Sequence, residues 1–572
     1  MRRSLMLLAW ALALLACSSS FASALIMRYY LKVANFRMHR LCRDQVITAV
    51  NSGTLPGPII VARDGDTLVV RVNNVSPYNV TIHWHGVFQL MSAWADGPEY
   101  ITQCPIRPGQ SFTYRFNVTR QEGTLLWHAH FKALRTTVHG ALIIRPARGR
   151  TYPFPAPFRE IPIVVGEWWN ANIMDVEEEA VSMGRPPNMS DALTINGQPG
   201  DLYPCSSNRT VRFRLVRGKT YLLRVINAAL NTPVFFKIAN HKFTVVAVDA
   251  SYTDPYDSDV LVIAPGQTVD ALMTADQAPL RYYMAVSSHV VPPQAPFVNT
   301  SATAIISYIG ASPLSPPFMP VMPDARDSDT AHAFLSNLTG LTSSPHWTPV
   351  PLDIDERMFV TVGLGLVSGR CDTPTGACSG PGSQMLAASM NNVSFELPER
   401  LSIMEAYVNN VSGIYTADFP DNPPVTYDYT NPANQQNPAV MATARGTRVK
   451  VFKYNATVEM VFQNTVVLSS DDHPMHLHGL NFYVVGQGFG NYNTQTDSAN
   501  FNLVNPQERN TVVVPAFGWV VIRFRANNPG VWFVHCHIDA HVPWGLSNAF
   551  IIENGPTPDT TLPPPPADLP KC

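Results

Sequence analysis

The stretch from Gly530 to Leu546 reads Gly-Val-Trp-Phe-Val-His-Cys-His-Ile-Asp-Ala-His-Val-Pro-Trp-Gly-Leu. Residues 531–534 are apolar and favour strand structure, so the following His535, Cys536 and His537 are predicted at a strand end. Successive side chains of a strand point to opposite faces, so the two histidines project one way and the cysteine the other. If all three bind metal, this short segment serves two metal sites at once.

The face that carries Cys536 predicts a particular kind of metal site. His541 follows four residues after His537, close enough to turn back toward the thiol. A sulfur with imidazoles and a weak axial position is typical of a blue-copper electron-transfer centre. The alternative is a strand that merely holds two histidines beside a buried free thiol.

Three further histidine groups weigh against that alternative. They are His83-Trp84-His85-Gly86, His128-Ala129-His130 and His473-Pro474-Met475-His476-Leu477-His478-Gly479. A His-x-His pair in a strand places two imidazoles on one face. The four groups together hold ten of the chain's 16 histidines. We expect surface or structural roles for the six others, which are His39, His139, His241, His289, His332 and His346.

In this order the four groups resemble those of multicopper oxidases, and the sequence between them resembles plant-type laccases over essentially the whole mature chain. The resemblance implies four coppers. It assigns Cys536, His473 and His541 to a type 1 copper, His83 and His476 to a type 2 copper, His85, His128 and His537 to one type 3 copper, and His130, His478 and His535 to the other. Ligands from both ends of the chain predict a cluster where the first and last domains meet. Zinc fits poorly, because eleven ligands far exceed one tetrahedral site.

The implied activity is that of a laccase, a benzenediol:oxygen oxidoreductase whose expected substrates are phenols, with monolignols as the class that the resemblance suggests. Reduction of O2 to water takes four electrons, whereas a phenol gives up one at a time. Cys536 would be the entry point, and His535 and His537 would lead from it to the cluster. The alternatives are another multicopper oxidase, such as an ascorbate oxidase or ferroxidase, and a copper-free structural relative in the cell wall. The presence of all eleven ligands disfavours the last.

Two further residues bear on the reaction. Leu546 stands ten residues after Cys536, at the family's axial position, and leucine cannot coordinate. The type 1 potential should therefore exceed that of relatives with methionine there, which favours phenol oxidation. Asp96, in Trp94-Ala95-Asp96-Gly97-Pro98, matches a family carboxylate that relays protons near the type 2 copper, although ordinary turn chemistry explains it equally well.

The fold class is predicted to be all-β, with three cupredoxin-like Greek-key β-sandwich domains. With 50 prolines and 33 glycines, the chain has short apolar runs between turn signals. A repeat follows Pro108-Gly109, Pro265-Gly266 and Pro515-Ala516, and its middle copy has apolar or small residues where the outer copies have ligands. The predicted divisions are domain one at 25–150, a structural domain two at 151–310, a linker at 311–351 and domain three at 352–572.

The N-terminus predicts secretion. Residues 1–24 hold basic residues, a short apolar run and small residues, which is typical of a signal peptide. Ten Asn-x-Ser/Thr sequons could carry surface glycans: Asn74, Asn79, Asn117, Asn188, Asn208, Asn299, Asn337, Asn392, Asn410 and Asn455. A net charge of −2 suggests neither nucleic acid nor a membrane as partner. We expect a monomeric, secreted glycoprotein, located in the apoplast or cell wall if the chain is from a plant.

Six cysteines remain once Cys17 of the signal peptide and the ligand Cys536 are set aside. Six cysteines allow about 15 connectivities, and the sequence alone does not choose among them. The family resemblance suggests Cys42–Cys205 and Cys104–Cys572, which leaves Cys371–Cys378.

Overall fold

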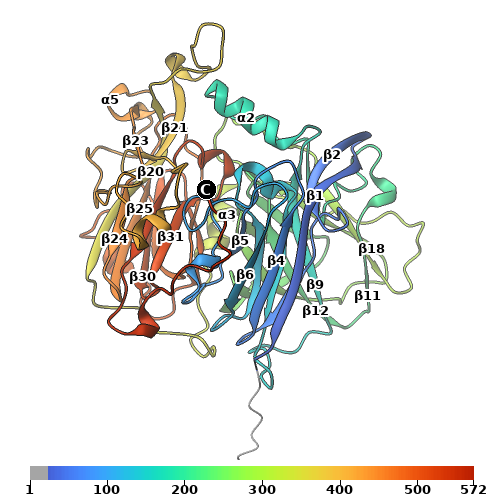
Figure 1. Ribbon diagram of the computed structural model, residues 1–572. Helices are drawn as coiled ribbons and strands as arrows, with labels where there is room; N and C mark the ends of the chain where they lie inside the picture. The colour runs from blue at the N-terminus through green and yellow to red at the C-terminus, as the bar shows by residue number, and fades with distance from the viewer. Residues whose placement is uncertain (1–23) are drawn as a thin grey trace, which may run out of the picture.

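The computed structural model describes residues 24–572, so the predicted signal peptide lies almost entirely outside the described residues. Its strands form six sheets, arranged as three pairs along the chain. In Figure 1 the orange-to-red strands of the last pair stand beside the blue strands of the first. This is the predicted all-β architecture of three cupredoxin-like sandwiches.

The first pair of sheets contains residues 26–145. One sheet has the order β2 (Arg43–Val50), β1 (Ile26–Arg40), β4 (Thr67–Asn74) and β6 (Ser111–Asn117), and the other β3 (Ile60–Arg63), β8 (His139–Arg145), β7 (Gly123–Ala129) and β5 (Ile82–His85). Strand β4 shows why these residues form a sandwich: Leu68, Val70 and Val72 are fully buried, and the residues between them are not. This period of two gives the sheet one apolar face.

The second pair contains residues 159–308. One sheet has the order β10 (Ala192–Ile195), β9 (Arg159–Trp168), β12 (Thr220–Asn227), β17 (Thr268–Thr274), β14 (Phe243–Val248) and β15 (Ser251–Ser258). The other has the order β11 (Arg212–Leu215), β19 (Ala302–Tyr308), β18 (Arg281–Ser288), β13 (Val234–Ile238) and β16 (Leu261–Ile263). The strands of both sheets enclose one apolar core.

The third pair contains residues 356–552. Its larger sheet has the order β23 (Ala444–Gly446), β22 (Val393–Phe395), β21 (Met385–Met390), β20 (Glu356–Val367), β25 (Ala456–Asn464), β30 (Gly518–Ala526), β27 (Phe482–Phe489) and β28 (Glu508–Arg509). The other has the order β24 (Val449–Phe452), β32 (Ser547–Ile552), β31 (Gly530–Cys536), β26 (His473–Leu477) and β29 (Thr511–Val514).

The α-helices of the described chain are short: α2 (Ile173–Met183), α3 (Ser328–Ser336), α4 (Ile403–Val408) and α5 (Pro438–Met441). Helix α2 begins where the Asn172 side chain accepts a hydrogen bond from the Met174 amide, and it ends at Gly184, whose φ of 64° is in the left-handed region. Helix α3 lies inside the segment 311–351, which the sequence suggested as a linker. The exact domain boundaries stay predictions.

Disulfides join distant parts of the chain. Cys42 pairs with Cys205 and so links the first sandwich to the second. Cys104 pairs with Cys572 and so holds the C-terminal tail against the first sandwich. Cys371 and Cys378 close a short local loop, and Cys536 is the free cysteine of the described chain. These pairings confirm the connectivity that the resemblance suggested.

One predicted glycan site does not lie on the surface. Asn74 is fully buried, and its amide nitrogen donates to the backbone oxygens of Tyr78 and Ile106. The sequon alone could not show this, because the neighbouring residues of β4 alternate between core and solvent. We therefore exclude Asn74 from the surface acceptors.

Candidate metal centre

Two pairs of strands carry most of the candidate ligands. In the first sandwich, His83 of β5 is directly opposite His128 of β7. In the third, His476 of β26 is directly opposite His535 of β31, and Met475 is opposite Cys536. These four strands are buried along their whole length because both faces are covered by other parts of the protein. The two sandwiches therefore present their imidazoles to each other in a largely buried space.

The described structure brings the predicted ligands together in compact sets. In each of four sets, every member offers a ligand atom within 4.8 Å of the others: His83, His85 and His476; His85, His128 and His537; His130, His478 and His535; and His473, Cys536 and His541. The first three adjoin one another, because His83 and His85 contact members of all of them. The fourth lies on the Cys536 side of β31, as the alternation of side chains requires.

Hydrogen bonds fix how most of the imidazoles are turned. The Nδ1 atoms of five histidines lie within 2.8–2.9 Å of an oxygen: His83 with the Asp96 backbone, His128 with the Ala129 backbone, His476 with the Asn510 backbone, His535 with the Cys536 backbone and His478 with the Asp96 carboxylate. An oxygen of this kind only accepts, so Nδ1 carries the proton and Nε2 keeps a free lone pair.

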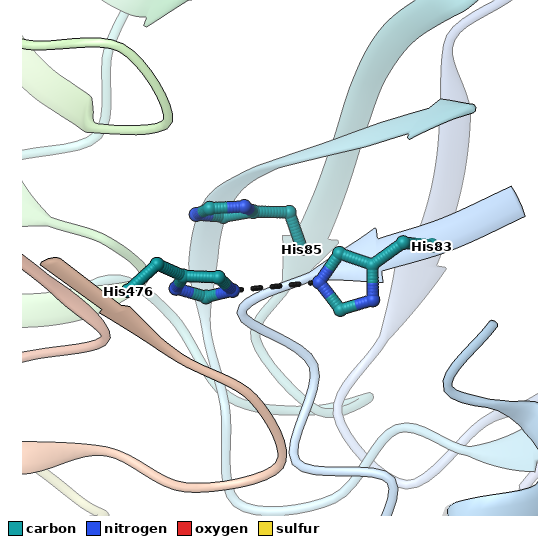
Figure 2. A group of neighbouring side chains, drawn as sticks. All are labelled: His83, His85 and His476. Atoms are coloured by element: carbon teal, nitrogen blue, oxygen red, sulfur yellow. Dashed lines mark hydrogen bonds between the residues drawn. The ribbon is translucent and has the colours of Figure 1, made fainter. Parts of the chain in front are cut away.

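These lone pairs face one another. His83 Nε2 lies 3.4 Å from His476 Nε2, and Figure 2 shows the two rings end to end with His85 lying over His476. His478 Nε2 lies 3.2 Å from His535 Nε2. With the protons held on Nδ1, neither contact has a donor, so a cation is what would make the arrangement favourable. The donor set therefore fits metal ions.

His85 differs from its neighbours. Its Nε2 lies 3.1 Å from the Thr511 hydroxyl, and its Nδ1 is buried without a hydrogen-bond partner among the described residues. The nitrogen available to a metal is therefore Nδ1 in His85. This distinction depends on a residue that is remote in the sequence and could not be predicted from it.

Burial favours the neutral form of several of the cluster imidazoles. The pKa of His85, His476 and His535 is lowered well below the ordinary value by burial, with neighbouring imidazoles adding to the effect. A neutral imidazole is the form that binds a metal. Desolvation and mutual repulsion of protonated rings thus favour the ligand form.

The second site is centred on Cys536. Its Sγ is fully buried, 3.4 Å from His541 Nδ1 and 3.7 Å from His473 Nδ1. The Cys536 amide donates to the Leu546 backbone oxygen at 3.0 Å, which holds the backbone of this fully buried leucine next to that of Cys536. Burial raises the pKa of the Cys536 thiol, so a bound metal would have to supply the charge that keeps it a thiolate.

Asp96 lies inside the cluster rather than serving only a turn. One carboxylate oxygen is 2.8 Å from His478 Nδ1 and the other is 3.3 Å from His83 Nδ1. The side chain is fully buried, and burial raises its pKa. It is placed to orient two imidazoles that come from different sandwiches.

The sequence did not single out Arg135, although its side chain contacts the candidate ligand His537. The buried Arg135 guanidinium pairs with Asp539 at 2.9 Å, and it donates to the backbone oxygens of His537 and Leu230. The role of a buried arginine depends on its partners, which here lie 95 residues away at Leu230 and 402 residues away at His537.

A cavity of about 740 Å³ leads to the cluster. His128, His130 and His535 lie on its wall together with apolar side chains such as Phe395 and Trp544. Small molecules such as O2 and water can therefore reach the cluster side, whereas Cys536 is not part of this wall.

Comparison with known proteins shows which family has this arrangement of domains. Profiles described as multicopper oxidase match residues 32–149, 159–311 and 418–556. The chain belongs to the multicopper oxidase family.

Within the family, its full-length relatives include plant laccases. It is 55% identical to Laccase-7 of Arabidopsis thaliana, with 99% of each chain covered, and 53% identical to Laccase-24 of Oryza sativa subsp. japonica, with 100% of this chain and 99% of the relative covered. A crystal structure of laccase from Botrytis aclada superposes with a TM-score of 0.72 at 26% identity, covering 95% of this chain and 89% of that one. These similarities support the plant-type laccases as its group within the family.

Among residues 24–572, no helix has the length and apolar character that crossing a membrane requires.

Proposed function

We propose that this protein is a laccase, which couples one-electron oxidation of phenols to reduction of O2 to water. The observation that carries this proposal is the buried segment 535–537 at the end of β31, where Cys536 belongs to one ligand set and its neighbours His535 and His537 belong to the sets of the cluster. The resemblance to plant laccases favours monolignols as the substrate class. The test is to measure O2 uptake with a phenol series, expecting four phenols consumed per O2 and no released peroxide.

The donor sets support four coppers. Cys536, His473 and His541 would hold a type 1 copper, and His83 and His476 a type 2 copper. His85, His128 and His537 would hold one copper of a type 3 pair, and His130, His478 and His535 the other. When bound, copper supplies one-electron acceptance at the first site and reduction of O2 at the cluster. Thiolate and imidazole are ligand types suited to copper.

The chain's own residues provide the connection and the shielding. Cys536 is joined to His535 and His537 by single peptide units, so the two sites communicate through a few covalent bonds. Full burial of the Cys536 side chain excludes water from the thiol. Asp96 and Arg135 hold the surrounding imidazoles and backbone in place through their hydrogen bonds.

Leu546 is proposed to raise the type 1 potential, and Leu546→Met should lower it. Leucine and methionine have similar volumes, so repacking should cost less than about 1.5 kcal/mol. A thioether beside the copper would favour its oxidised form. Each fall of about 59 mV corresponds to a tenfold change in the one-electron equilibrium.

The measurement is a redox titration of both proteins together with rates for phenols of graded oxidation potential. Phenols that are hard to oxidise should slow most in the methionine variant, because their electron transfer has least driving force to lose. An unchanged or raised potential would contradict the role given to Leu546.

Asp96 is proposed to serve the cluster, and two substitutions distinguish its possible roles. Asp96→Ala should lower O2 reduction by about 10- to 100-fold, as losses of outer contacts to metal ligands usually do, while the blue absorption stays. Asp96→Asn retains an oxygen that can accept from His478. If the variant with asparagine recovers the rate, orientation is the role; if it is as slow as the alanine variant, proton transfer is. If both variants reduce O2 at the wild-type rate, the role of Asp96 is confined to forming the turn.

We propose secretion, a monomer and phenolic partners rather than nucleic acid or membranes, on the basis of the signal sequence and the near-neutral charge. An ascorbate oxidase or ferroxidase is the competing activity. Rates with ascorbate and Fe(II) beside the phenol series decide between them. A copper-free relative would show no copper by metal analysis.

A further inference from the structure

His346, one of the six scattered histidines, faces two carboxylates. Its Nε2 lies 3.3 Å from Asp64 Oδ2 and 3.4 Å from Glu122 Oε1. His346 belongs to the segment between the second and third sandwiches, Asp64 follows β3, and Glu122 precedes β7. Three groups of metal-binding type, distant in sequence, thus converge on one point.

The second oxygen of each carboxylate is already occupied. Asp64 Oδ1 accepts a hydrogen bond from the Arg120 amide at 2.7 Å, and Glu122 Oε2 accepts one from the Tyr252 hydroxyl at 2.7 Å. These contacts leave one oxygen of each carboxylate directed at the same imidazole nitrogen. Metal-binding carboxylates are commonly held by outer hydrogen bonds of this kind.

An ion pair alone does not satisfy these atoms. Nε2 of an imidazolium carries one hydrogen and can make one good hydrogen bond, whereas two oxygens face it. The Glu122 side chain is only 1% exposed, and neither its Oε1 nor His346 Nε2 has a hydrogen-bond partner among the described residues. Leaving a buried charged oxygen unpaired is unfavourable, so these atoms call for another partner.

The distances are those of ligands around one ion. A charge-assisted hydrogen bond between nitrogen and oxygen would be about 2.7–2.9 Å long, shorter than both contacts. Two ligands that each lie about 2.1 Å from a tetrahedral ion are about 3.4 Å apart. One imidazole and two carboxylates are also a donor set that zinc accepts.

We propose that Asp64, Glu122 and His346 bind a divalent transition metal, zinc by its preferred ligands and geometry, outside the oxidase centre. Glu122 and His346 line a cavity of about 640 Å³, from which water could complete the shell of a bound ion. The proton is the competitor for this position, because the two carboxylates raise the pKa of His346 to about 9 against the opposing effect of burial.

The metal would join the segment between the second and third sandwiches to the first sandwich. That segment is already fixed to the third sandwich, because Tyr483 donates to the Thr348 backbone oxygen at 2.7 Å and packs against Trp347. Tyr252, which supports Glu122, comes from the second sandwich. Zinc at this point would therefore tie the first sandwich to the segment that is fixed to the third, while Tyr252 connects the site to the second through a hydrogen bond.

Calorimetric titration of the copper-loaded protein with ZnCl2 tests the proposal. The wild type should bind one zinc per chain, and Glu122→Gln and His346→Gln should each weaken binding by at least about 100-fold. Tyr252→Phe, which removes only an outer contact, should weaken it by about 10-fold. Glu508→Gln is the matched control, because Glu508 lies on the same cavity wall outside the triad, and it should bind zinc as the wild type does.

Anomalous diffraction at the zinc edge from zinc-soaked wild-type crystals keeps the proposal testable if a variant does not fold. The peak should lie about 2.0–2.2 Å from the three ligand atoms. A peak elsewhere, no bound zinc, or equal affinity in wild type and Glu122→Gln would each overturn the proposal and leave an ion pair only.

Discussion

Substitution of Cys536 by serine is expected to abolish the blue absorption and to reduce phenol oxidation at least about a thousandfold, which corresponds to about 4 kcal/mol of barrier. The thiol sulfur lies between His473 and His541 in a fully buried site. A serine hydroxyl fits the same space but is not a soft donor, so the intense thiolate-to-copper transition has no source. The electron entry point is lost with it.

The cluster should survive this change. His535 of β31 and His537 just after it belong to the cluster sets, and their backbone does not depend on the sulfur. Metal analysis should therefore find about three coppers instead of four, with the type 2 signal in the electron paramagnetic resonance spectrum retained. Leu546→Met is the matched control, since it alters the same site and should stay blue. A blue serine variant would remove Cys536 from the type 1 site.

The all-β fold and the faces that carry the candidate ligands could be predicted from a period of two, whereas the division of those ligands into sets came from the resemblance to multicopper oxidases. Alternation in segments such as 531–537 decides which side chains share a face. The two imidazoles of a His-x-His pair in a strand therefore lie on the same face. The repeat placed the apolar middle copy between two ligand-bearing copies. In the structure, His83 lies directly opposite His128, and His476 lies directly opposite His535. Strand pairing therefore brings together histidines from separate motifs.

The supporting contacts could not be predicted, because their partners are set by the packing of whole sandwiches. Thr511 decides which nitrogen of His85 is free, and Arg135 fixes the backbone at His537, yet neither carries a recognisable motif. The sequence allowed two roles for Asp96, in a turn or in a proton relay. Only the packing of two sandwiches places its carboxylate against His478. His346 is a similar case, because a single histidine in the sequence does not indicate a metal site. The proposed site becomes visible only when the structure places His346 beside Asp64 and Glu122.

Substitution of His83 by alanine is expected to stop O2 consumption while leaving the blue site intact. His83 Nε2 faces His476 across the interface between the first and third sandwiches. Its ring also stacks on that of His478, with the ring centroids 3.9 Å apart. Removing it takes a ligand from the cluster and none from the set of Cys536, His473 and His541. Phenol should therefore bleach the blue colour once, and the colour should not return in air, because electrons enter but have no complete cluster to reach.

Stopped-flow absorbance beside an oxygen electrode measures both halves of this expectation. His83→Gln serves as a second variant, since it fills most of the space that alanine would leave in a fully packed site and so separates ligand loss from a cavity effect. His39→Ala is the control for loss of a histidine, because the His39 side chain is 39% exposed and its ring pairs with Asp44 at the surface. O2 uptake near the wild-type rate in both His83 variants would exclude this residue from the cluster. Loss of the blue colour before any phenol is added would instead show that the two metal sites depend on each other for assembly, contrary to the separation that β31 imposes.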